Sequence, residues 1–265
     1  MVTINVNGSV NSLVVNVNRD GAVIEANGDE VWSAGPSYPP YLTFSSTARF
    51  SIETDELTAF WDGTIEYSTD ANNWSTWDGT KVYSAATNGT HYLYLRGTGN
   101  TYISATSSSS VNAWGISGTA PVSCDGDIMT LLDYTDPENA TMADYCFAYM
   151  FSSSNSLVKP PTLTATTLST GCYRSMFQNS VLAELPKITA SEFPSLCCSR
   201  MVSGCSFICL SETQTGEYQT PYTLPADGTA TAASNAFNYM FQNTGGTFTG
   251  NPTVNTTYYT SNLVV

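Results

Sequence analysis

The chain has 265 residues, and few of them are charged: eight Lys and Arg against 22 Asp and Glu give a formal net charge of −14. With so few cations there is no electrostatic footprint for a phosphate backbone, and an anionic membrane surface would repel the chain, so nucleic acid and lipid are poor partners. No apolar run approaches the ~20 residues that a membrane span needs, so no membrane insertion is expected.

The N-terminal segment, residues 1–36, has the pattern of short β-strands. Apolar and polar residues alternate over residues 2–6 and again over residues 13–17, as in strands with one buried face. A segment this short has little core of its own, so we predict that it is an anchor that docks on another chain or on another copy of itself. It also lacks the basic start and apolar block of a secretory signal, so export by that route is not expected unless a leader has been removed.

Residues 41–135 show several short strand patterns separated by Asp-Gly, Asn-Gly and Thr-Gly turns. This arrangement predicts a β-sandwich of immunoglobulin-like type. Trp74 and Trp77 follow a hairpin tip and stand three residues apart, which places them on opposite faces of a regular strand. An outward tryptophan can stack on the apolar C–H face of a sugar ring, so Trp74 and Trp77 are candidate ligand-binding residues; the alternative is that they belong to the core.

From residue 136 to 265 the chain repeats itself. Segments of one template begin at Met142 (MADYCFAYMF), Leu168 (LSTGCYRSMF), Phe193 (FPSLCCSRMV) and Ala232 (AASNAFNYMF). One column of the template holds Cys146, Cys172 and Cys197 at nearly equal intervals, and the fourth copy follows after a longer gap. Self-similarity with a period in the twenties indicates a solenoid of stacked units.

Within a unit, apolar residues recur every four positions, at Met142, Cys146 and Met150, which predicts a short helix. A proline-punctuated extended piece follows each one. We therefore expect a mainly β protein with short helices, whose C-terminal part is an α/β solenoid of the leucine-rich-like kind. Its predicted core consists of Cys146, Met150, Phe151, Cys172, Met176, Phe177, Cys197, Met201 and Phe241.

The longer gap before the fourth copy contains the insertion SETQTGEYQTPYTLP. Loops that interrupt a repeat array often lie on its functional face. Tyr218 and Tyr222, both in this insertion, are therefore further candidate ligand-binding residues.

The sequence offers little for catalysis or for metal binding. Its seven cysteines are odd in number, lack a CxxC pair, and are accompanied by the single histidine His91, so we predict buried free thiols, no metal site and no cofactor. No nucleophile–base motif or phosphate-binding loop is present. Paired carboxylates such as Asp29-Glu30 leave a two-carboxylate glycosidase open, but we expect no enzyme.

The repeated units resemble the BspA-type leucine-rich-like repeats of gut bacteria and their phages. The resemblance rests on Ala165-Thr166-Thr167-Leu168, Cys172-Tyr173 and Met176-Phe177, and covers residues 140–210 well. The second cysteine of the family pattern is replaced in the first two units and appears only as Cys205 in the third. Residues 41–132 also resemble, with less specific motifs, the domain that precedes these repeats in gut-phage structural proteins.

This resemblance implies a virion surface protein, such as a head fibre, a capsid decoration protein or a tail adhesin. It would be assembled in the host cytoplasm, hold a phage capsid or tail protein through the N-terminal segment, form a homo-oligomer, and present the repeats to a glycan or protein of the host surface or to mucus. The alternatives are an extracellular adhesin or carbohydrate-binding module on a bacterial surface, and an architectural decoration protein with no ligand.

Overall fold

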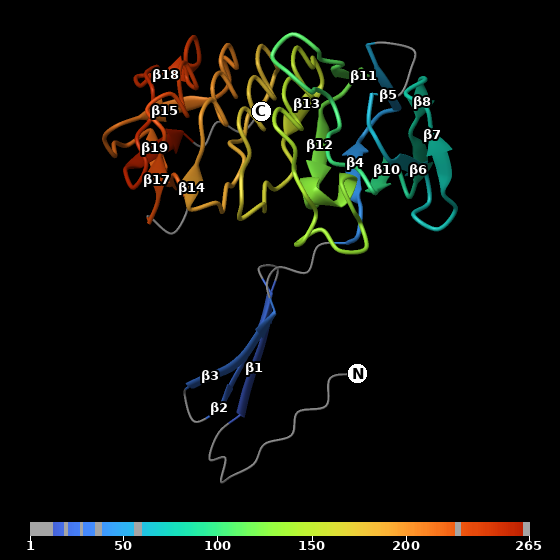
Figure 1. The fold of residues 1–265 in the computed structure, drawn as a ribbon, viewed down its shortest axis with the longest axis horizontal. Helices are drawn as coiled ribbons and strands as arrows, with labels where there is room; N and C mark the ends of the chain where they lie inside the picture. The colour runs from blue at the N-terminus through green and yellow to red at the C-terminus, as the bar shows by residue number, and fades with distance from the viewer. Residues whose placement is uncertain are drawn as a thin grey trace. The chain divides into compact units, whose positions relative to one another are not determined.

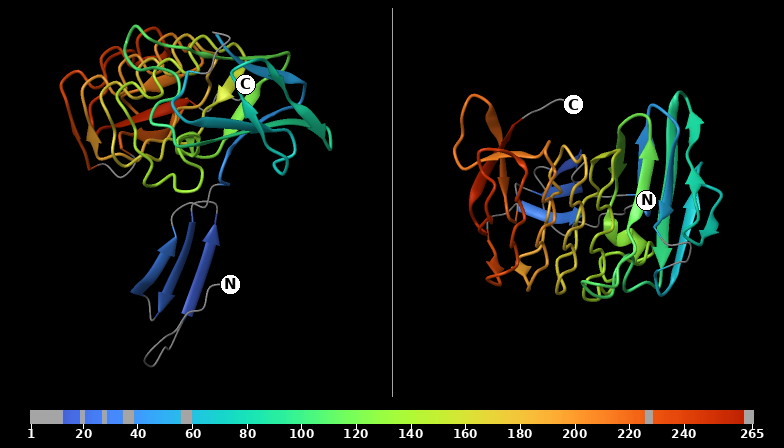
Figure 2. Two further views of the ribbon diagram at one scale, coloured as in Figure 1. Left: turned by 45° about the vertical axis from the view of Figure 1, so that its right-hand side comes forward. Right: turned by 90° about the horizontal axis from the view of Figure 1, so that it is seen from above.

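The computed structural model describes residues 13–18, 21–26, 29–34, 39–55, 60–225 and 229–261, which form the ribbon in Figures 1 and 2. The chain divides into two compact units, residues 1–39 and residues 40–265. The predicted alternation over residues 2–6 lies outside the described residues. No helix within the described part is long and apolar enough to cross a bilayer.

The first unit contains a three-stranded antiparallel sheet in the order β1-β2-β3. Its strands are β1 (Leu13–Asn18), β2 (Gly21–Ala26) and β3 (Asp29–Ala34). The register between β2 and β3 shifts once, between Ile24 and Glu25. The alternating pattern of residues 13–17 thus corresponds to one regular strand at the edge of this sheet.

The second unit begins with two sheets. The larger has the order β13-β12-β4-β10-β6-β7, with β9 also paired to β10, and the smaller has the order β11-β5-β8. Their strands are β4 (Leu42–Ser46), β5 (Phe50–Thr54), β6 (Thr64–Ser68), β7 (Ser75–Trp77), β8 (Val82–Tyr83), β9 (Ala85–Thr87), β10 (Thr90–Thr98), β11 (Trp114–Gly118), β12 (Val122–Asp125) and β13 (Leu157–Lys159). Apolar side chains at alternate positions, among them Phe44, Ile52 and Leu95, are fully buried, as expected for strands with one face on a core.

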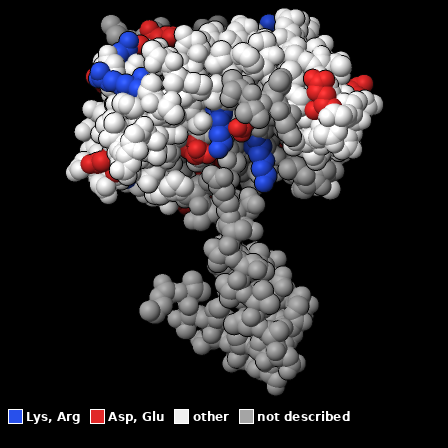
Figure 3. Space-filling model, turned by 180° about the vertical axis from the view of Figure 1, so that it is seen from behind, with Lys and Arg blue, Asp and Glu red and all other residues white. Residues whose placement is uncertain are grey.

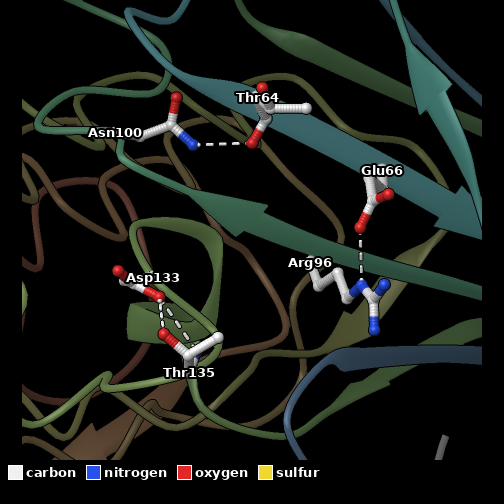
Figure 4. Close-up of polar contacts among 6 residues, drawn as sticks. All are labelled: Thr64, Glu66, Arg96, Asn100, Asp133 and Thr135. Atoms are coloured by element: carbon white, nitrogen blue, oxygen red, sulfur yellow. Dashed lines mark hydrogen bonds and ion pairs between the residues drawn. The ribbon is translucent and has the colours of Figure 1, made fainter.

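A buried asparagine fastens the end of β10 to its neighbours. Asn100 donates from Nδ2 to the carbonyl oxygens of Thr64 and Leu131, each at 2.9 Å, and its Oδ1 accepts from the amide of Gly63 at 2.7 Å. Figure 4 shows the bond to Thr64. Leu131 ends the short 3-10 helix η1 (Ile128–Leu131). Because both polar atoms of this buried amide are paired, it holds the sheet and η1 together without leaving a polar group unsatisfied.

The mainly β prediction is confirmed, but the prediction of short helices is wrong: no α-helix occurs in the described residues. Each repeat instead forms a coil of successive tight turns. In the first coil the amide of Cys146 donates to the Ala143 carbonyl oxygen (3.3 Å), and the amide of Ala148 donates to that of Tyr145 (2.9 Å). These bonds span three residues, whereas an α-helix requires four.

The amides between these turn donors point to the next coil. Tyr145 donates to Thr170 (2.8 Å) and Phe147 donates to Cys172 (2.9 Å). The pattern recurs at the later junctions, where Tyr173 donates to Cys197 and Cys198 to Ala236. Backbone amides thus donate alternately within a coil and to the next coil. No amide remains to form the hydrogen bonds of an α-helix.

A left-handed residue at every fourth position makes these turns possible. In the first coil these residues are Tyr145, Tyr149 and Ser153, with φ of 61°, 61° and 59°. Later coils have Gly171, Ser175, Asn179, Leu196, Arg200, Gly204, Tyr239 and Asn243 at such positions. The spacing of four that predicted a helix is therefore real, but it comes from a turn pattern with the same period.

We call the four segments 143–154, 169–180, 194–205 and 233–244 the coil stack. All nine predicted core residues are fully buried in it. Equivalent aromatic rings lie face to face in neighbouring coils: Phe151 and Phe177 are 5.8 Å apart and Phe147 and Tyr173 are 6.0 Å apart, each pair inclined by 17°. All seven cysteines are free, and only Cys209 is partly exposed; burial raises the pKa of thiols such as Cys146 and Cys172.

The coil stack and the two sheets share one core. The amide of Trp114 donates to the Met150 carbonyl oxygen (2.6 Å), and the amide of Ile103 donates to that of Cys146 (3.0 Å). Phe151 also lies against Phe44 and Trp114, with ring centroids 6.2 and 6.4 Å apart. Strand and loop residues that precede the repeats thus cover the first coil as a further coil would, and residues 41–135 and 136–265 fold together.

The remaining strands belong to the far end of the coil stack. They form a sheet in the order β16-β19-β15-β18 and the pair β14-β17. Their bounds are β14 (Glu192–Phe193), β15 (Cys209–Ser211), β16 (Tyr218–Thr223), β17 (Thr231–Ala232), β18 (Gly245–Gly246) and β19 (Thr257–Ser261). β16 comes from the predicted insertion and pairs with β19.

Candidate functional site

The outward face of β10 carries a row of polar aromatic side chains. Along this strand Leu93 and Leu95 are buried, while Tyr92, Tyr94 and Arg96 alternate with them and are partly exposed. The Tyr92 and Tyr94 rings are 5.9 Å apart and nearly parallel, at 5°. A strand with one face on the core thus presents two aligned rings to solvent.

Two further aromatic residues extend this row. Tyr41, just before β4, lies edge-on to Tyr94 at 5.4 Å and tilted against Trp74 at 5.5 Å. Trp74 directly precedes β7 and is partly exposed. We call Tyr41, Trp74, Tyr92, Tyr94, Arg96 and Tyr134 the aromatic face.

Arg96 holds the aromatic face in place. Its Cζ lies 4.0 Å from the Trp74 ring centre and 4.1 Å from that of Tyr134. Its Nε donates to Oε2 of Glu66 at 2.7 Å, as Figure 4 shows. Each cation–π contact contributes about 0.5–1 kcal/mol at an exposed site. Together with the ion pair to Glu66, these contacts fix the positions of the Trp74 and Tyr134 rings.

The loop before Trp74 is ordered by Asp70. Its carboxylate accepts bonds from the amides of Asn72 and Asn73, at 2.9 and 2.8 Å, and from the Ser68 hydroxyl at 2.9 Å. Hydrogen bonds, first of all those from Asn73, hold the pKa of Asp70 well below its ordinary value, so it is ionised near neutral pH. Burial raises the pKa of the Tyr94 phenol, with smaller contributions from Tyr41, Tyr92 and Asp70, so Tyr94 remains a neutral hydrogen-bonding group.

The structure separates the two predicted tryptophans. Trp77 is only 2% exposed; it stacks on Trp61 at 5.4 Å, meets Trp114 edge-on at 4.9 Å, and donates from Nε1 to the Thr80 carbonyl oxygen at 2.6 Å. Trp77 is therefore a core residue that cannot reach a ligand. Only Trp74 belongs to the surface.

The two predicted tyrosines lie on β16, which belongs to a different sheet from β10. Tyr218 is 8% exposed, which leaves little of it for contact. Tyr222 is partly exposed, lines a cavity, and donates its hydroxyl to the Pro186 carbonyl oxygen at 3.3 Å. The predicted ligand-binding residues thus fall into two separate places, and one of each pair is buried.

Sequence reasoning missed every member of the aromatic face except Trp74, namely Tyr41, Tyr92, Tyr94, Arg96 and Tyr134. The signal for the two β10 tyrosines was present in the stretch HYLYLRG, where Tyr alternates with Leu. The roles of Tyr41 and Arg96 depend on which strands neighbour β10, namely β4 and β6, and a single sequence does not show that order.

Charged side chains are sparse on the surface of residues 40–265. On the face of residues 40–265 that Figure 3 shows, acidic and basic side chains stand in small separate groups on a largely uncharged surface. Among the described residues, no three His, Cys, Asp or Glu side chains gather closely enough to hold a metal ion. Rings and neutral hydroxyl and amide groups therefore dominate what the surface offers a ligand.

No protein-family model, curated protein or solved structure matches the chain.

Proposed function

We propose that the protein is a non-enzymatic accessory protein of a phage virion, a head fibre or capsid decoration, that displays residues 40–265 for adhesion to a host cell surface, mucus or glycans. The observation that carries the adhesive part is the aromatic face. Sugar rings stack their C–H faces on aromatic side chains and bond to neighbouring polar groups. Tyr92 and Tyr94 offer both, and Tyr41 connects Tyr94 to Trp74.

The division of the chain supports display on a particle. Residues 1–39 form a unit separate from the body, and this unit would dock on a capsid or tail protein, as a homo-oligomer. In the body, the two sheets would be an immunoglobulin-like sandwich and the coil stack a leucine-rich-like solenoid. Many copies on one particle raise the avidity of weak single contacts.

An adhesion assay tests the aromatic face. The double variant Tyr92→Ala, Tyr94→Ala is expected to bind immobilised mucin and glycans about tenfold or more weakly than wild type, because each aromatic contact contributes about 0.5–1.5 kcal/mol beyond its buried area. Tyr83→Ala serves as the matched control, since Tyr83 is an exposed strand tyrosine on β8, outside the aromatic face. Equal retention of wild type and double variant would rule out the aromatic face as the adhesive surface.

Localisation tests the virion assignment separately. Electron microscopy with gold-labelled antibodies against residues 40–265 is expected to mark the surface of phage particles. Label confined to a bacterial envelope would overturn the virion assignment and support a bacterial surface adhesin or carbohydrate-binding module instead, which the aromatic face fits equally well.

A further inference from the structure

A cavity of about 790 Å³ lies between the extended pieces of the coils and the sheet of β16 and β19. Its floor contains Val158, Ala183 and Ile208, which follow one another at intervals of 25 residues, close to the period of the repeat. The amide of Ala183 donates to the Val158 carbonyl oxygen at 2.8 Å, which ties one coil to the next. The floor is therefore built from the same position of three successive repeat units.

The insertion supplies the wall. Pro221 and Tyr222 of β16 and Ser261 of β19 line the cavity. Because the Tyr222 hydroxyl is bonded to the Pro186 carbonyl oxygen, the orientation of its ring is fixed. A second cavity of about 330 Å³ is also lined by Pro221 and Tyr222.

One polar atom of the wall lacks a partner. The hydroxyl oxygen of Ser261 is buried and makes no hydrogen bond in the structure. Buried hydroxyls are nearly always paired, since an unpaired one costs about 1–3 kcal/mol. Because Ser261 lines the cavity, a rotation of its side chain would bring this unpaired hydroxyl to a molecule there.

The charges of the cavity disfavour an anionic occupant. Lys159 lines it, but its Nζ is paired with Oδ1 of Asp125 at 2.6 Å. Glu184, which holds the position of Lys159 in the next repeat, adds a carboxylate to the lining. A neutral molecule rich in hydroxyl groups fits better, because hydroxyls can donate to Glu184 and pair with Ser261 while C–H groups contact Pro221 and Tyr222.

We propose that this cavity is a binding site for a neutral oligosaccharide. Its volume is in the range of about 300–1,000 Å³ that small-molecule sites occupy. Its lining shares no residue with the aromatic face, so the site requires neither that face nor a particle on which the chain is displayed. This site would bind its ligand through residues of the repeat part of the chain.

Calorimetric titration of the full chain with hexasaccharides tests this. Neutral probes are (1→4)-linked glucose, mannose, xylose, galactose and N-acetylglucosamine, and hexagalacturonate is the anionic probe. At least one neutral probe is expected to bind, and hexagalacturonate to bind about tenfold or more weakly. Absence of binding by all five neutral probes overturns the proposal, as does preferred binding of hexagalacturonate.

Variants locate the binding. Ala183→Trp fills the floor and Glu184→Gln removes the carboxylate, and each is expected to weaken the neutral probe about tenfold or more. Glu212→Gln is the control, because Glu212 is an exposed carboxylate of the insertion that does not line the cavity. Thermal melting checks that Ala183→Trp is folded, and Glu184→Gln carries the test if it is not.

The two proposed sites fail in different ways. Binding that survives both cavity variants within about twofold, a difference well below 1 kcal/mol, overturns the cavity site. If that binding is instead lost in the Tyr92→Ala, Tyr94→Ala variant, it belongs to the aromatic face, and the proposed adhesive function stands without the cavity.

Discussion

Met176→Asp is expected to unfold the coil stack. Met176 is fully buried in the second coil, between Met150 and Met201 at the same position of the neighbouring coils. Removing a buried Met side chain costs about 2–5 kcal/mol, and an unpaired carboxylate in its place costs several more. The total rivals the ~5–15 kcal/mol that stabilises a typical domain.

Urea unfolding followed by circular dichroism measures this effect. Met176→Leu keeps the volume and is expected to cost less than about 1.5 kcal/mol. Thr167→Asp places the same charge on an exposed position and is expected to change stability by at most about 0.5 kcal/mol. A Met176→Asp chain that melts cooperatively with wild-type stability would contradict the burial of this column.

Gly97→Ala is expected to destabilise the sheets by about 4 kcal/mol or more, through overpacking and the loss of buried hydrogen bonds. A Cβ at Gly97 would collide with the Leu131 carbonyl group, whose carbon would lie at 2.6 Å, and would come within 2.8 Å of Nδ2 of Asn100. Backbone and a buried amide cannot move aside cheaply. The substitution would therefore break the bonds that Asn100 makes to Thr64 and Leu131.

Gly115→Ala provides the matched comparison on strand β11. A Cβ there would meet nothing closer than the Glu53 carbonyl oxygen at 3.8 Å, an ordinary contact. It is expected to be neutral or to stabilise by up to about 1 kcal/mol, because alanine restricts the unfolded chain. Equal unfolding free energies for the two variants would show that β10 does not lie against Leu131 as described.

The repeat was readable in the sequence, but its local structure was not. The columns of Cys, Met and Phe follow from the period, because side chains that stack must recur in step. Met142, Cys146 and Met150 are spaced by four, and that spacing fits a helix as well as it fits the turns observed. Glycine, the usual mark of a left-handed residue, occupies such positions only at Gly171 and Gly204 of the stack.

The candidate sites were predictable only in part. The repeat period that brings Val158, Ala183 and Ile208 together was visible in advance, whereas the cover provided by β16 depends on its pairing with β19. The sequence alone did not show which of Trp74 and Trp77 is buried. The structure does, because β7 pairs with β6 in a register that turns Trp77 inward, opposite Ile65.

The alternation of turns and coil-to-coil bonds is tested most directly at Ser175, by the unfolding free energies of Ser175→Gly and Ser175→Val. Ser175 is fully buried, has φ of 54°, and its hydroxyl has no hydrogen-bond partner. Glycine removes both a left-handed strain of about 1–2 kcal/mol and the unpaired hydroxyl, against about 0.5–1 kcal/mol of lost chain entropy.

We expect Ser175→Gly to stabilise the protein by about 1 kcal/mol, and Ser175→Val to destabilise it by about 2 kcal/mol or more, because a β-branched residue strongly resists positive φ and adds volume to a packed core. In a helix glycine would be the worse of the two. A Ser175→Val chain at least as stable as Ser175→Gly would contradict the turn structure of the coils.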